Sequence, residues 1–430
     1  MEIGKRYSMV EKVKTDKKKL LIYAHYYIPD VASTGQILRE LAEGMIHEFD
    51  ITIVCVVPSY TGKVADEYKK KMFYKEEVNG VKVIRIRVPE FSKSNKISRI
   101  KNILAYFIGA MIATFKVGKM DYVYSISQPP ILGGLLGVWG KWMKRAKYIY
   151  NIQDFNPEQT MAVGYSKNKL VLKAMMMFDK FSCRQADKVI VVGRDMVETL
   201  KGRFKGRKVP NHTFINNWID EKEIYPLPAD HEKVVAFKEK YGLQGKFIIM
   251  YSGNLGLYYD LENLMNVIEK FKDREDVVFA FIGEGTIREK LVQYKEKHNL
   301  QNVKFIPYQD KSDLIYSLNA GDVHWVVNAK GIQGVSVPSK LYGVMAAGKP
   351  IIGVLEEGSE ARLIIEEVTC GYVTEPQNYK GIEEVITQII KLKDDSNLSE
   401  MGEQGRGYLV KYLTKDVSVK KYTQEIGSSG

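Results

Sequence analysis

Glycine-rich runs that follow apolar segments are the first residues in this sequence that could do chemistry. The run Tyr251 to Gly256 follows one apolar segment of β-strand length, and Ile282 to Gly285 follows the next. Glycine lets a phosphate group approach backbone N–H donors closely. A plain tight turn is the alternative interpretation of each run. The phosphate interpretation assigns to one phosphate-binding site the residues Gly253, Asn254, Gly256, Gly283 and Glu284.

A third segment, Val337 to Pro350, contains a lysine where an anion could bind. Its pattern predicts an extended residue before proline, a Ser339 N-cap, a short helix and a glycine stop. Lys340 would stand in the first turn of that helix, where cationic and dipolar effects favour an anion. A capped surface helix with a solvated lysine is the alternative.

Two titratable side chains stand where strands are expected to end. Asp154 could orient a hydroxyl group of a substrate, or it could be a buried cap at the start of a helix. His25 is the one histidine of six at a strand end in the expected cleft, and it could act as a hydrogen-bond donor or a base. A histidine with only structural hydrogen bonds is the alternative.

Weaker candidates complete the set. Ser33, Thr34 and Gly35 join the first expected strand to a helix and could contact a diphosphate or an acceptor, or they could be a simple helix cap. Glu360 could reach sugar hydroxyl groups, or it could be a solvated surface glutamate.

The elements that must position these residues alternate between apolar runs and helical patterns. Strands are expected at 20–25, 51–57, 81–88, 122–127, 148–153 and 189–192, then at 247–252, 277–282, 303–307, 323–327 and 351–354. Helices between strands indicate βαβ units and parallel sheets. The sequence therefore predicts an α/β protein with two doubly wound, Rossmann-like domains facing across a cleft, because such sheets bind ligands beyond the carboxyl ends of their strands.

Changes in composition and pattern set the expected domain boundaries. We expect a basic N-terminal extension, a first α/β domain, a linker, a second α/β domain, and a C-terminal helix with a tail that crosses back to the first domain. The corresponding residues are 1–18, 19–215, 216–245, 246–408 and 409–430.

Charge and cysteine content limit the partners and the compartment. The 430 residues include 64 Lys and Arg against 52 Asp and Glu, a formal net charge of +12, which favours anionic partners. Three scattered cysteines indicate neither a disulfide framework nor a zinc site. Without a signal-like or membrane-spanning apolar run, we expect a cytoplasmic protein, peripheral on the inner membrane face.

A basic and apolar stretch, residues 93–119, suggests how such a protein could reach a membrane. Lysines and arginines, Lys93 among them, bracket the apolar run 103–115, which is too short to span a bilayer but suited to its interface. A second run, 131–142, repeats the pattern, although we interpret that one as a core helix. A core helix is also the alternative for the first run.

In order and spacing, these segments resemble the retaining GT-B glycosyltransferases of family 4. The resemblance is strongest to the subgroup of O-antigen and capsule transferases, including fucosamine transferases. It is carried by Ser252 to Gly256, Pro338 to Gly348, Gln153 to Glu158 and Asn216 to Asp220. It implies transfer of a sugar from a nucleotide donor, which we expect to be UDP-linked, to a sugar or polyprenyl-diphosphate-sugar acceptor in surface polysaccharide synthesis. The first domain, 19–215, would then bind the acceptor, and Asp154 would orient the acceptor or the sugar. The second domain, 246–408, would bind the nucleotide sugar through the residues of its glycine-rich runs together with Ser339, Lys340 and Glu360.

The sequence departs from the family at the donor. Two glutamates that many members carry are replaced by Val335 and Gly343, and the second of these normally holds the donor ribose. Asn254 stands in the place of a common arginine, and Tyr258, Tyr259 and Asp260 stand near the place of a common lysine. Lys340 is our candidate to compensate for the missing cations.

The resemblance also implies a mechanism. In a retaining transferase the acceptor hydroxyl attacks from the face that the phosphate leaves, and catalysis depends on stabilising the departing diphosphate. Since no D-x-D motif ends a strand, we expect a metal-independent enzyme without a cofactor. Two alternatives remain open: a nucleotide-sugar epimerase of GT-B shape and a basic nucleic-acid-binding protein, although no nucleic-acid-binding motif is present.

Overall fold

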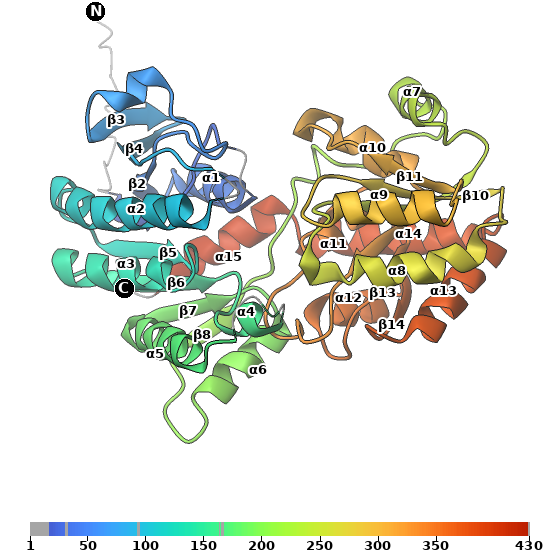
Figure 1. Ribbon diagram of the computed structural model, residues 1–430. Coiled ribbons are helices and arrows are strands. Elements are labelled where there is room, and N and C mark those ends of the chain that lie inside the picture. The colour runs from blue at the N-terminus through green and yellow to red at the C-terminus, as the bar shows by residue number, and fades with distance from the viewer. Residues whose placement is uncertain (1–16, 31–32, 93–94, 163, 165–166, 429–430) are drawn as a thin grey trace, which may run out of the picture. The chain divides into compact units, whose positions relative to one another are not determined.

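The computed structural model describes residues 17–30, 33–92, 95–162, 164 and 167–428. Residues 1–16 of the predicted basic extension and Lys93 of the predicted membrane stretch lie outside these ranges. The chain divides into two compact units, Met1–Val123 with Gly140–Ala146, and Tyr124–Trp139 with Lys147–Gly430. Each unit is described by itself below (Figure 1).

The first unit holds four strands of an eight-stranded sheet, in the order β3-β4-β2-β1. Its strands β1, β2 and β4 run parallel and are almost fully buried, which matches their apolar, β-branched sequences. Helix α2 packs on β2 and β4. The bounds are β1 Lys18–Tyr23, α1 Ser33–Met45, β2 Phe49–Val56, η1 Asp66–Lys69, β3 Phe73–Val78, β4 Val81–Ile86 and α2 Lys96–Lys116.

Strand β3 lies outside the apolar runs from which strands are predicted. It pairs antiparallel with β4 through a two-residue turn, Asn79-Gly80, in which both residues have positive φ angles. An Asn-Gly pair between two extended segments is the strongest short hairpin signal, because both residues tolerate positive φ. The first sheet therefore has an antiparallel edge.

The remaining four strands of that sheet, in the order β5-β6-β7-β8, fall mainly in the second unit, and the pairs β6–β7 and β7–β8 are parallel. The bounds are β5 Tyr122–Ile126, α3 Leu132–Lys144, β6 Lys147–Ile152, α4 Glu158–Ala162, α5 Lys169–Gln185, β7 Lys188–Val191, α6 Arg194–Arg203 and β8 His212–Phe214.

The second unit also contains a parallel six-stranded sheet, in the order β11-β10-β9-β12-β13-β14. The bounds are α7 Glu232–Tyr241, β9 Phe247–Ser252, η2 Leu257–Tyr259, α8 Leu261–Ile268, η3 Glu269–Phe271, β10 Val277–Ile282, α9 Arg288–Lys297, β11 Val303–Ile306, η4 Lys311–Asp313, α10 Leu314–Ala320, β12 Val323–Val327, α11 Lys340–Ala346, β13 Ile351–Val354, α12 Glu360–Val368, β14 Gly371–Thr374 and α13 Tyr379–Lys391.

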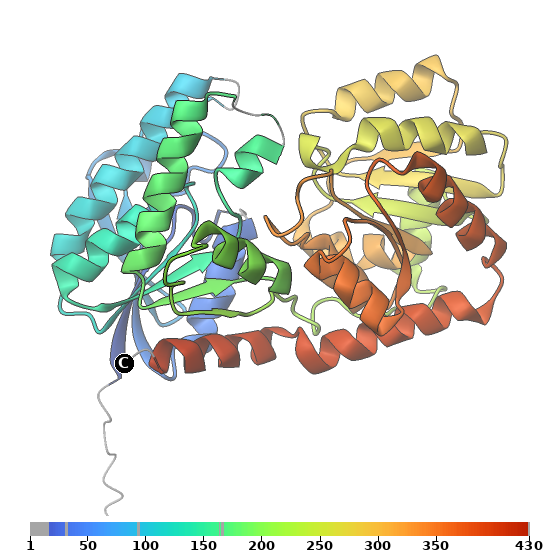
Figure 2. The ribbon, with the colours of Figure 1, turned by 90° about the horizontal axis from the view of Figure 1, so that it is seen from below.

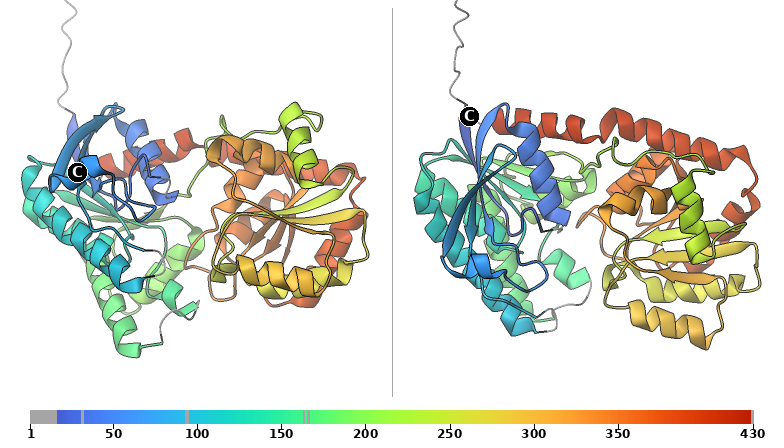
Figure 3. Two further views of the ribbon diagram at one scale, coloured as in Figure 1. Left: turned by 45° about the horizontal axis from the view of Figure 1, so that its top comes forward. Right: turned by 90° about the horizontal axis from the view of Figure 1, so that it is seen from above.

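Helices cover both faces of the six-stranded sheet (Figure 3). One face packs on α8, α9 and α13 in a large apolar core, and the other packs on α7 and α10 in a smaller one. The chain leaves β9 toward β10 and β11 and later returns to β12 on the other side, so the winding direction reverses between β9 and β12. The carboxyl ends of these two strands form the switch point where such sheets bind ligands.

Two C-terminal helices follow one another along the second unit, α14 Ser396–Tyr412 and α15 Lys415–Gly427 (Figure 2). Arg406 on α14 donates hydrogen bonds of 2.9 Å to the carbonyl oxygens of Ile224 and Ala346. Tyr422 on α15 is buried, and its hydroxyl accepts a hydrogen bond of 3.1 Å from Asn151 on β6. The C-terminal helix therefore packs against a strand of the first sheet.

The predicted fold class is confirmed, because the chain forms two sheets of mainly parallel strands with α-helical crossovers. Each strand expected from an apolar run is present, with ends that shift by a few residues. Among the described residues, no helix combines the length and the apolar character needed to cross a bilayer.

Candidate active site

The two glycine turns of the six-stranded sheet contact each other directly at the carboxyl ends of β9 and β10. The Gly253 N–H donates to Ile282 O at 2.9 Å, and φ is +149° at Gly253 and +135° at Gly283. A Cβ atom on Gly283 would lie 2.0 Å from the carbonyl oxygen of Gly253. Because any side chain would collide with backbone there, only glycine allows the turns to approach so closely.

Lys340 lies directly against the first of these turns. A Cβ atom on Gly253 would stand 2.3 Å from Lys340 Cε, so the lysine stem occupies the space that a side chain at 253 would fill. Its Nζ lies 3.8 Å from the ring centroid of Tyr259 and 5.1 Å from that of Tyr251. The glycine thus gives the lysine access to the end of β9.

In the part of the chain that the structure describes, the Lys340 ammonium lies on aromatic faces and has no carboxylate within ion-pair distance. Burial lowers the pKa of Lys340 to about 7. A cation with a lowered pKa and no carboxylate partner gains most from a bound anion, so this side chain is suited to hold a phosphate group.

Asn254 and Gly256 complete the turn after β9. The Tyr251 hydroxyl donates a hydrogen bond of 2.7 Å to the backbone oxygen of Asn254, and the Asn254 side chain packs against Gly256. Glu284 is largely exposed and pairs with Arg288 at 3.6 Å. These residues line the same edge of the sheet as Gly253.

Ser339 does not act as the predicted helix cap. Its backbone is helical, with φ −63° and ψ −19°, and its side chain makes no capping hydrogen bond. A capping serine needs an extended backbone to turn its hydroxyl toward the free N–H groups. Since α11 also has only seven residues, the anion-binding capacity of this segment rests on the Lys340 side chain.

Asp154 follows β6 and lies on a loop that pairs with the segment leading to Lys340. It forms an isolated antiparallel bridge with Ser336, and the Phe155 N–H donates to Val335 O at 2.9 Å. Burial raises the pKa of Asp154 to about 6, against hydrogen bonds from Gln128, Gln159 and Ser336 that lower it. The carboxyl group is therefore poised to titrate near neutral pH.

Tyr259 is the residue that links Asp154 to Lys340. Burial, and then the negative charge of Asp154, raise the pKa of Tyr259 to about 12, so the carboxylate and the phenol are close in space. The Tyr259 ring also carries the Lys340 ammonium on its face. In the sequence this tyrosine is only a departure from the family pattern, and an aromatic residue in place of a cation is the signal for its role.

Glu360 occupies a different environment from the one predicted. Its buried carboxylate accepts hydrogen bonds from the backbone N–H and Nε of Arg194, at 2.8 and 2.9 Å, and from Asn216 Nδ2 at 2.9 Å. Arg194 also pairs with Glu367 at 2.7 Å. Because three donors already engage its oxygens, Glu360 ties α12 to α6 rather than presenting a free acceptor.

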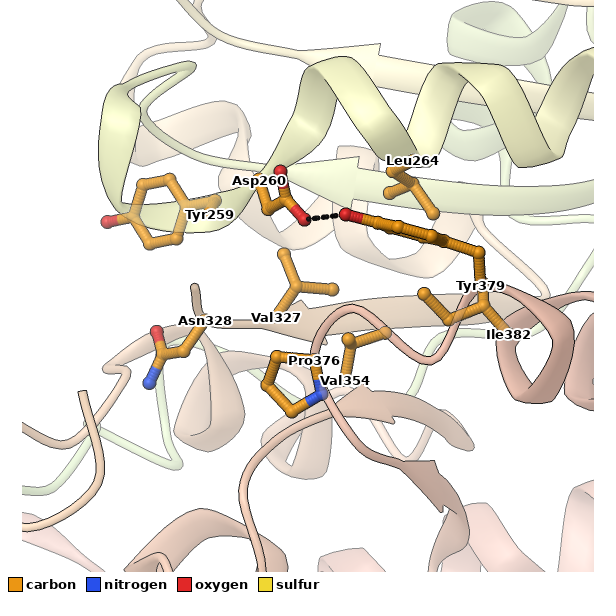
Figure 4. A pocket seen from close by; sticks show the side chains of 9 residues that line it. All are labelled: Tyr259, Asp260, Leu264, Val327, Asn328, Val354, Pro376, Tyr379 and Ile382. Carbon is orange, nitrogen blue, oxygen red and sulfur yellow. Dashed lines mark hydrogen bonds between the residues drawn. The ribbon is translucent and has the colours of Figure 1, made fainter. Parts of the chain in front are cut away.

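A narrow cavity lies beside Tyr259 at the ends of β12 and β13 (Figure 4). Tyr379 donates a hydrogen bond of 3.0 Å to the Asp260 carboxylate, and these two residues and Asn328 line the cavity. Its volume of about 10 Å³ has room for roughly one water molecule. This cavity is too small to hold a sugar or a base.

The predicted residues of the first unit gather after β1. His25 stacks on Tyr106, with ring centroids 4.8 Å apart, and burial lowers its pKa to about 4, so its ring is neutral at physiological pH. Its buried Nε2 has no hydrogen-bond partner among the described residues. Ser33 and Thr34 begin α1, and a Cβ atom on Gly35 would lie 3.1 Å from Tyr26 O.

Among the residues that the structure describes, no group of three or more His, Cys, Asp or Glu side chains is arranged to hold a metal ion. The chemical groups that converge within the second unit are a lysine, a tyrosine, a carboxyl group and glycine turns. Together they can bind an anionic leaving group and orient a hydroxyl.

Two family models match the chain in succession. Residues 34–218 match the glycosyl transferase 4-like domain, and residues 233–408 match the glycosyl transferases group 1. The first match spans α1 to the end of the first sheet, and the second spans α7 to α14 with both glycine turns and Lys340.

Two relatives in bacteria have similar sequences along most of their length. A probable glycosyltransferase of Pseudomonas aeruginosa, WbjE, is 27% identical over 345 residues, which cover 78% of this chain and 82% of WbjE. A putative colanic acid biosynthesis glycosyl transferase of Escherichia coli K12, WcaI, is 23% identical over 416 residues, which cover 95% of this chain and 99% of WcaI.

Solved structures share the fold. Sucrose-phosphate synthase from Thermosynechococcus elongatus superposes with a TM-score of 0.73 at 14% identity, covering 96% of this chain and 99% of its own. Anabaena HepE, solved with UDP and glucose, superposes with a TM-score of 0.68 at 13% identity, covering 96% of this chain and 100% of its own.

Proposed function

Because this chain belongs to the group 1 glycosyltransferases with a GT-B fold, we propose that it moves a sugar from a UDP-linked donor to a lipid-linked sugar acceptor, with retention of configuration. The observation that carries the proposal is Lys340, a cation without a carboxylate partner in the described chain, placed against the Gly253 turn at the switch point of the six-stranded sheet. The UDP that HepE binds supports the choice of donor.

In the proposed reaction the acceptor hydroxyl attacks the anomeric carbon of the donor sugar. The bond between that carbon and the β-phosphate oxygen breaks, the new glycosidic bond forms on the same face, and UDP leaves with its electron pair. A departing phosphate oxygen takes the hydroxyl proton. Lys340 and the N–H groups of the glycine turns stabilise the charge that develops on the diphosphate.

Other side chains have positioning roles in this proposal. Tyr259 holds the Lys340 ammonium at the turn through its ring face, and Asp154, as a carboxylate, orients a hydroxyl of the acceptor or of the sugar. His25 is a further proposed donor or acceptor of hydrogen bonds, and the loop Ser33 to Gly35 a further contact for substrate. These groups need no metal ion, so we propose a reaction that proceeds in the presence of a chelator.

The exposed face of α2 supports a membrane-bound acceptor. Apolar side chains recur on that face at intervals of three or four residues, each at least 40% exposed: Ile97, Ile100, Leu104, Ile108, Ile112 and Phe115. The opposite face, with Tyr106 and Gly109, packs on the sheet. A helix with one apolar solvent face and flanking lysines suits the bilayer interface, so we propose that α2 rests on the inner membrane face. The colanic acid role in the name of WcaI supports an acceptor of surface polysaccharide synthesis.

The testing experiment measures UDP release from a panel of UDP-sugars in excess EDTA, with and without a polyprenyl-diphosphate-sugar acceptor. We expect acceptor-dependent release from one donor, lost in Lys340→Met and retained in Lys297→Met, which alters an exposed lysine of α9. Acceptor-independent conversion of the donor to an epimer would support the epimerase alternative instead. Absence of release with every donor and acceptor would contradict the proposal.

A further inference from the structure

A lysine-rich groove lies in the first unit, at the end of α2. Its volume is about 310 Å³. The residues whose charges face it are Lys19, Lys75, Lys82, Lys116, Lys119, Asp50 and Glu76. Because Thr52 is buried and also lines it, the floor of the groove is partly polar.

The two carboxylates of the groove are already neutralised. Asp50 accepts two hydrogen bonds of 2.8 Å from Lys82, and Glu76 pairs with Arg85 at 2.6 Å. The Asp121 carboxylate accepts the backbone N–H of Lys19 at 2.8 Å. The groove therefore has an excess of positive charge even after its acidic neighbours are counted.

Four lysines of the groove contribute that excess. In the described part of the chain, no carboxylate lies within ion-pair distance of the ammonium groups of Lys19, Lys75, Lys116 and Lys119. Lys116 Nζ rests 5.0 Å from the ring centroid of Phe73. Like charges gathered around one concavity repel each other unless an anion is bound, so the groove has the chemistry of an anion site.

The groove is distinct from the substrate edge of its sheet. Lys19, Asp50 and Lys82 lie at the amino ends of β1, β2 and β4, whereas His25 and the loop at Ser33 follow the carboxyl end of β1. Substrates of parallel α/β sheets bind beyond the carboxyl ends. A ligand of the groove is therefore an additional partner.

The neighbouring surface of α2 identifies that partner. The apolar stripe of α2 ends at Phe115, the residue before groove-lining Lys116, so a bilayer that receives the stripe would bring its phosphate layer to the groove. We propose that the groove binds the phosphate head group of an anionic phospholipid. This inference rests on the membrane contact of α2 in the proposed function, but not on the sugar that is transferred.

The test compares binding to vesicles of phosphatidylcholine alone with binding to vesicles that also contain phosphatidylglycerol, by co-sedimentation at physiological salt. The groove variant is Lys75→Gln/Lys116→Gln/Lys119→Gln. Its charge-matched control is Lys240→Gln/Lys272→Gln/Lys297→Gln, at exposed lysines of the second unit. Lysines near an anionic surface each contribute about fivefold to binding, so we expect about 100-fold weaker binding of the groove variant to the anionic vesicles.

The control variant should bind anionic vesicles within threefold of the wild type. If the groove variant and the control variant lost binding to anionic vesicles equally, the groove proposal would be overturned, because net charge alone would then explain the losses. Equal binding of the wild type to both vesicle types would overturn the head-group assignment and leave only the contact of α2. No binding to either vesicle would overturn both membrane proposals.

Two further readouts separate these results from folding and from catalysis. The groove variant should keep the thermal midpoint of the wild type and its affinity for UDP, because its changed residues are exposed and none of them belongs to the glycine turns or contacts Lys340. The proposal would be overturned if the groove variant lost both vesicle binding and thermal stability while Lys75→Gln alone bound vesicles as well as the wild type.

Discussion

Lys340 and Glu360 are both charged residues that the sequence places at the donor, yet the protein surrounds them differently. Lys340 rests on the Tyr259 ring without a carboxylate partner in the described chain, and burial lowers its pKa. Glu360 is buried among donors from Arg194 and Asn216. A charge that the protein leaves uncompensated can serve a ligand, whereas a charge with a full set of partners serves the fold.

Replacing the uncompensated charge should have the largest effect. In Lys340→Met we expect kcat/KM for UDP-sugar to fall by about 100-fold or more, the cost of removing one donor from a developing oxyanion. Thermal stability should be unchanged or higher, because a partly buried charge is removed. Steady-state kinetics and a thermal melt check both, and a fall in kcat/KM below fivefold would break the comparison.

Replacing the compensated charge should affect stability instead. Glu360→Gln leaves Arg194 with a weaker partner, and we expect the free energy of unfolding to fall by about 2 kcal/mol, while kcat/KM changes by no more than about twofold. Urea titration and the same kinetic assay provide the test. If kcat/KM fell tenfold without a loss of stability, Glu360 would have to be returned to the donor site.

Gly253→Ala tests the space that Lys340 occupies. The new Cβ would stand 2.3 Å from Lys340 Cε, at a φ angle that side chains rarely adopt. We expect UDP affinity to fall by about tenfold, through displaced lysine and backbone strain of about 1–3 kcal/mol. Isothermal titration with UDP measures the effect, and wild-type affinity would show that the lysine does not need this contact.

The pH dependence of kcat/KM follows from two groups. If transfer needs Asp154 ionised and Lys340 protonated, kcat/KM rises with pH through about 6 and falls above about 7. Between pH 7 and 8 the protonated fraction of Lys340 decreases by about fivefold, and kcat/KM should follow. Asp154→Asn should abolish the acidic limb alone. A flat profile between pH 5 and 9 would contradict both assignments.

The smallest effect should come from the aromatic support. Tyr259→Leu removes the ring face under Lys340, and a cation–π contact of about 1 kcal/mol predicts about fivefold weaker UDP binding. Tyr259→Phe keeps the ring and should bind UDP within twofold of the wild type. Equal affinities of the Leu and Phe variants would remove Tyr259 from the account.

The fold was predictable to the level of its strands because short apolar runs that alternate with helical patterns favour parallel sheets covered by helices. Strand β3 does not follow from the alternation of strands and helices, because it pairs antiparallel, although Asn79-Gly80 signals its hairpin. The glycine turns were predictable as turns, because glycine is the residue type that most readily adopts positive φ angles. Their mutual contact was not predictable, since it depends on the register of β9 and β10.

The hydrogen-bond and ion-pair partners of Glu360 and Asp154 could not be predicted from the sequence. Glu360 meets Arg194 across 166 positions, and Asp154 meets Ser336 across a similar separation, so no local pattern reveals either contact. For Ser339 a local pattern gave a wrong prediction. The capping sequence is present, but the backbone of Ser339 is helical and not extended, so its side chain does not cap the helix. Side chains whose role depends on long-range contacts require the folded structure.

Equilibrium binding of UDP in excess EDTA to the wild type, Lys340→Met and Lys297→Met tests the central claim most directly. The account predicts that the wild type and Lys297→Met bind UDP with equal affinity and that Lys340→Met binds it at least about 30-fold more weakly, since a charge-assisted contact to phosphate contributes about 2–3 kcal/mol. Equal affinity of all three proteins would contradict the claim that Lys340 is the diphosphate-binding cation.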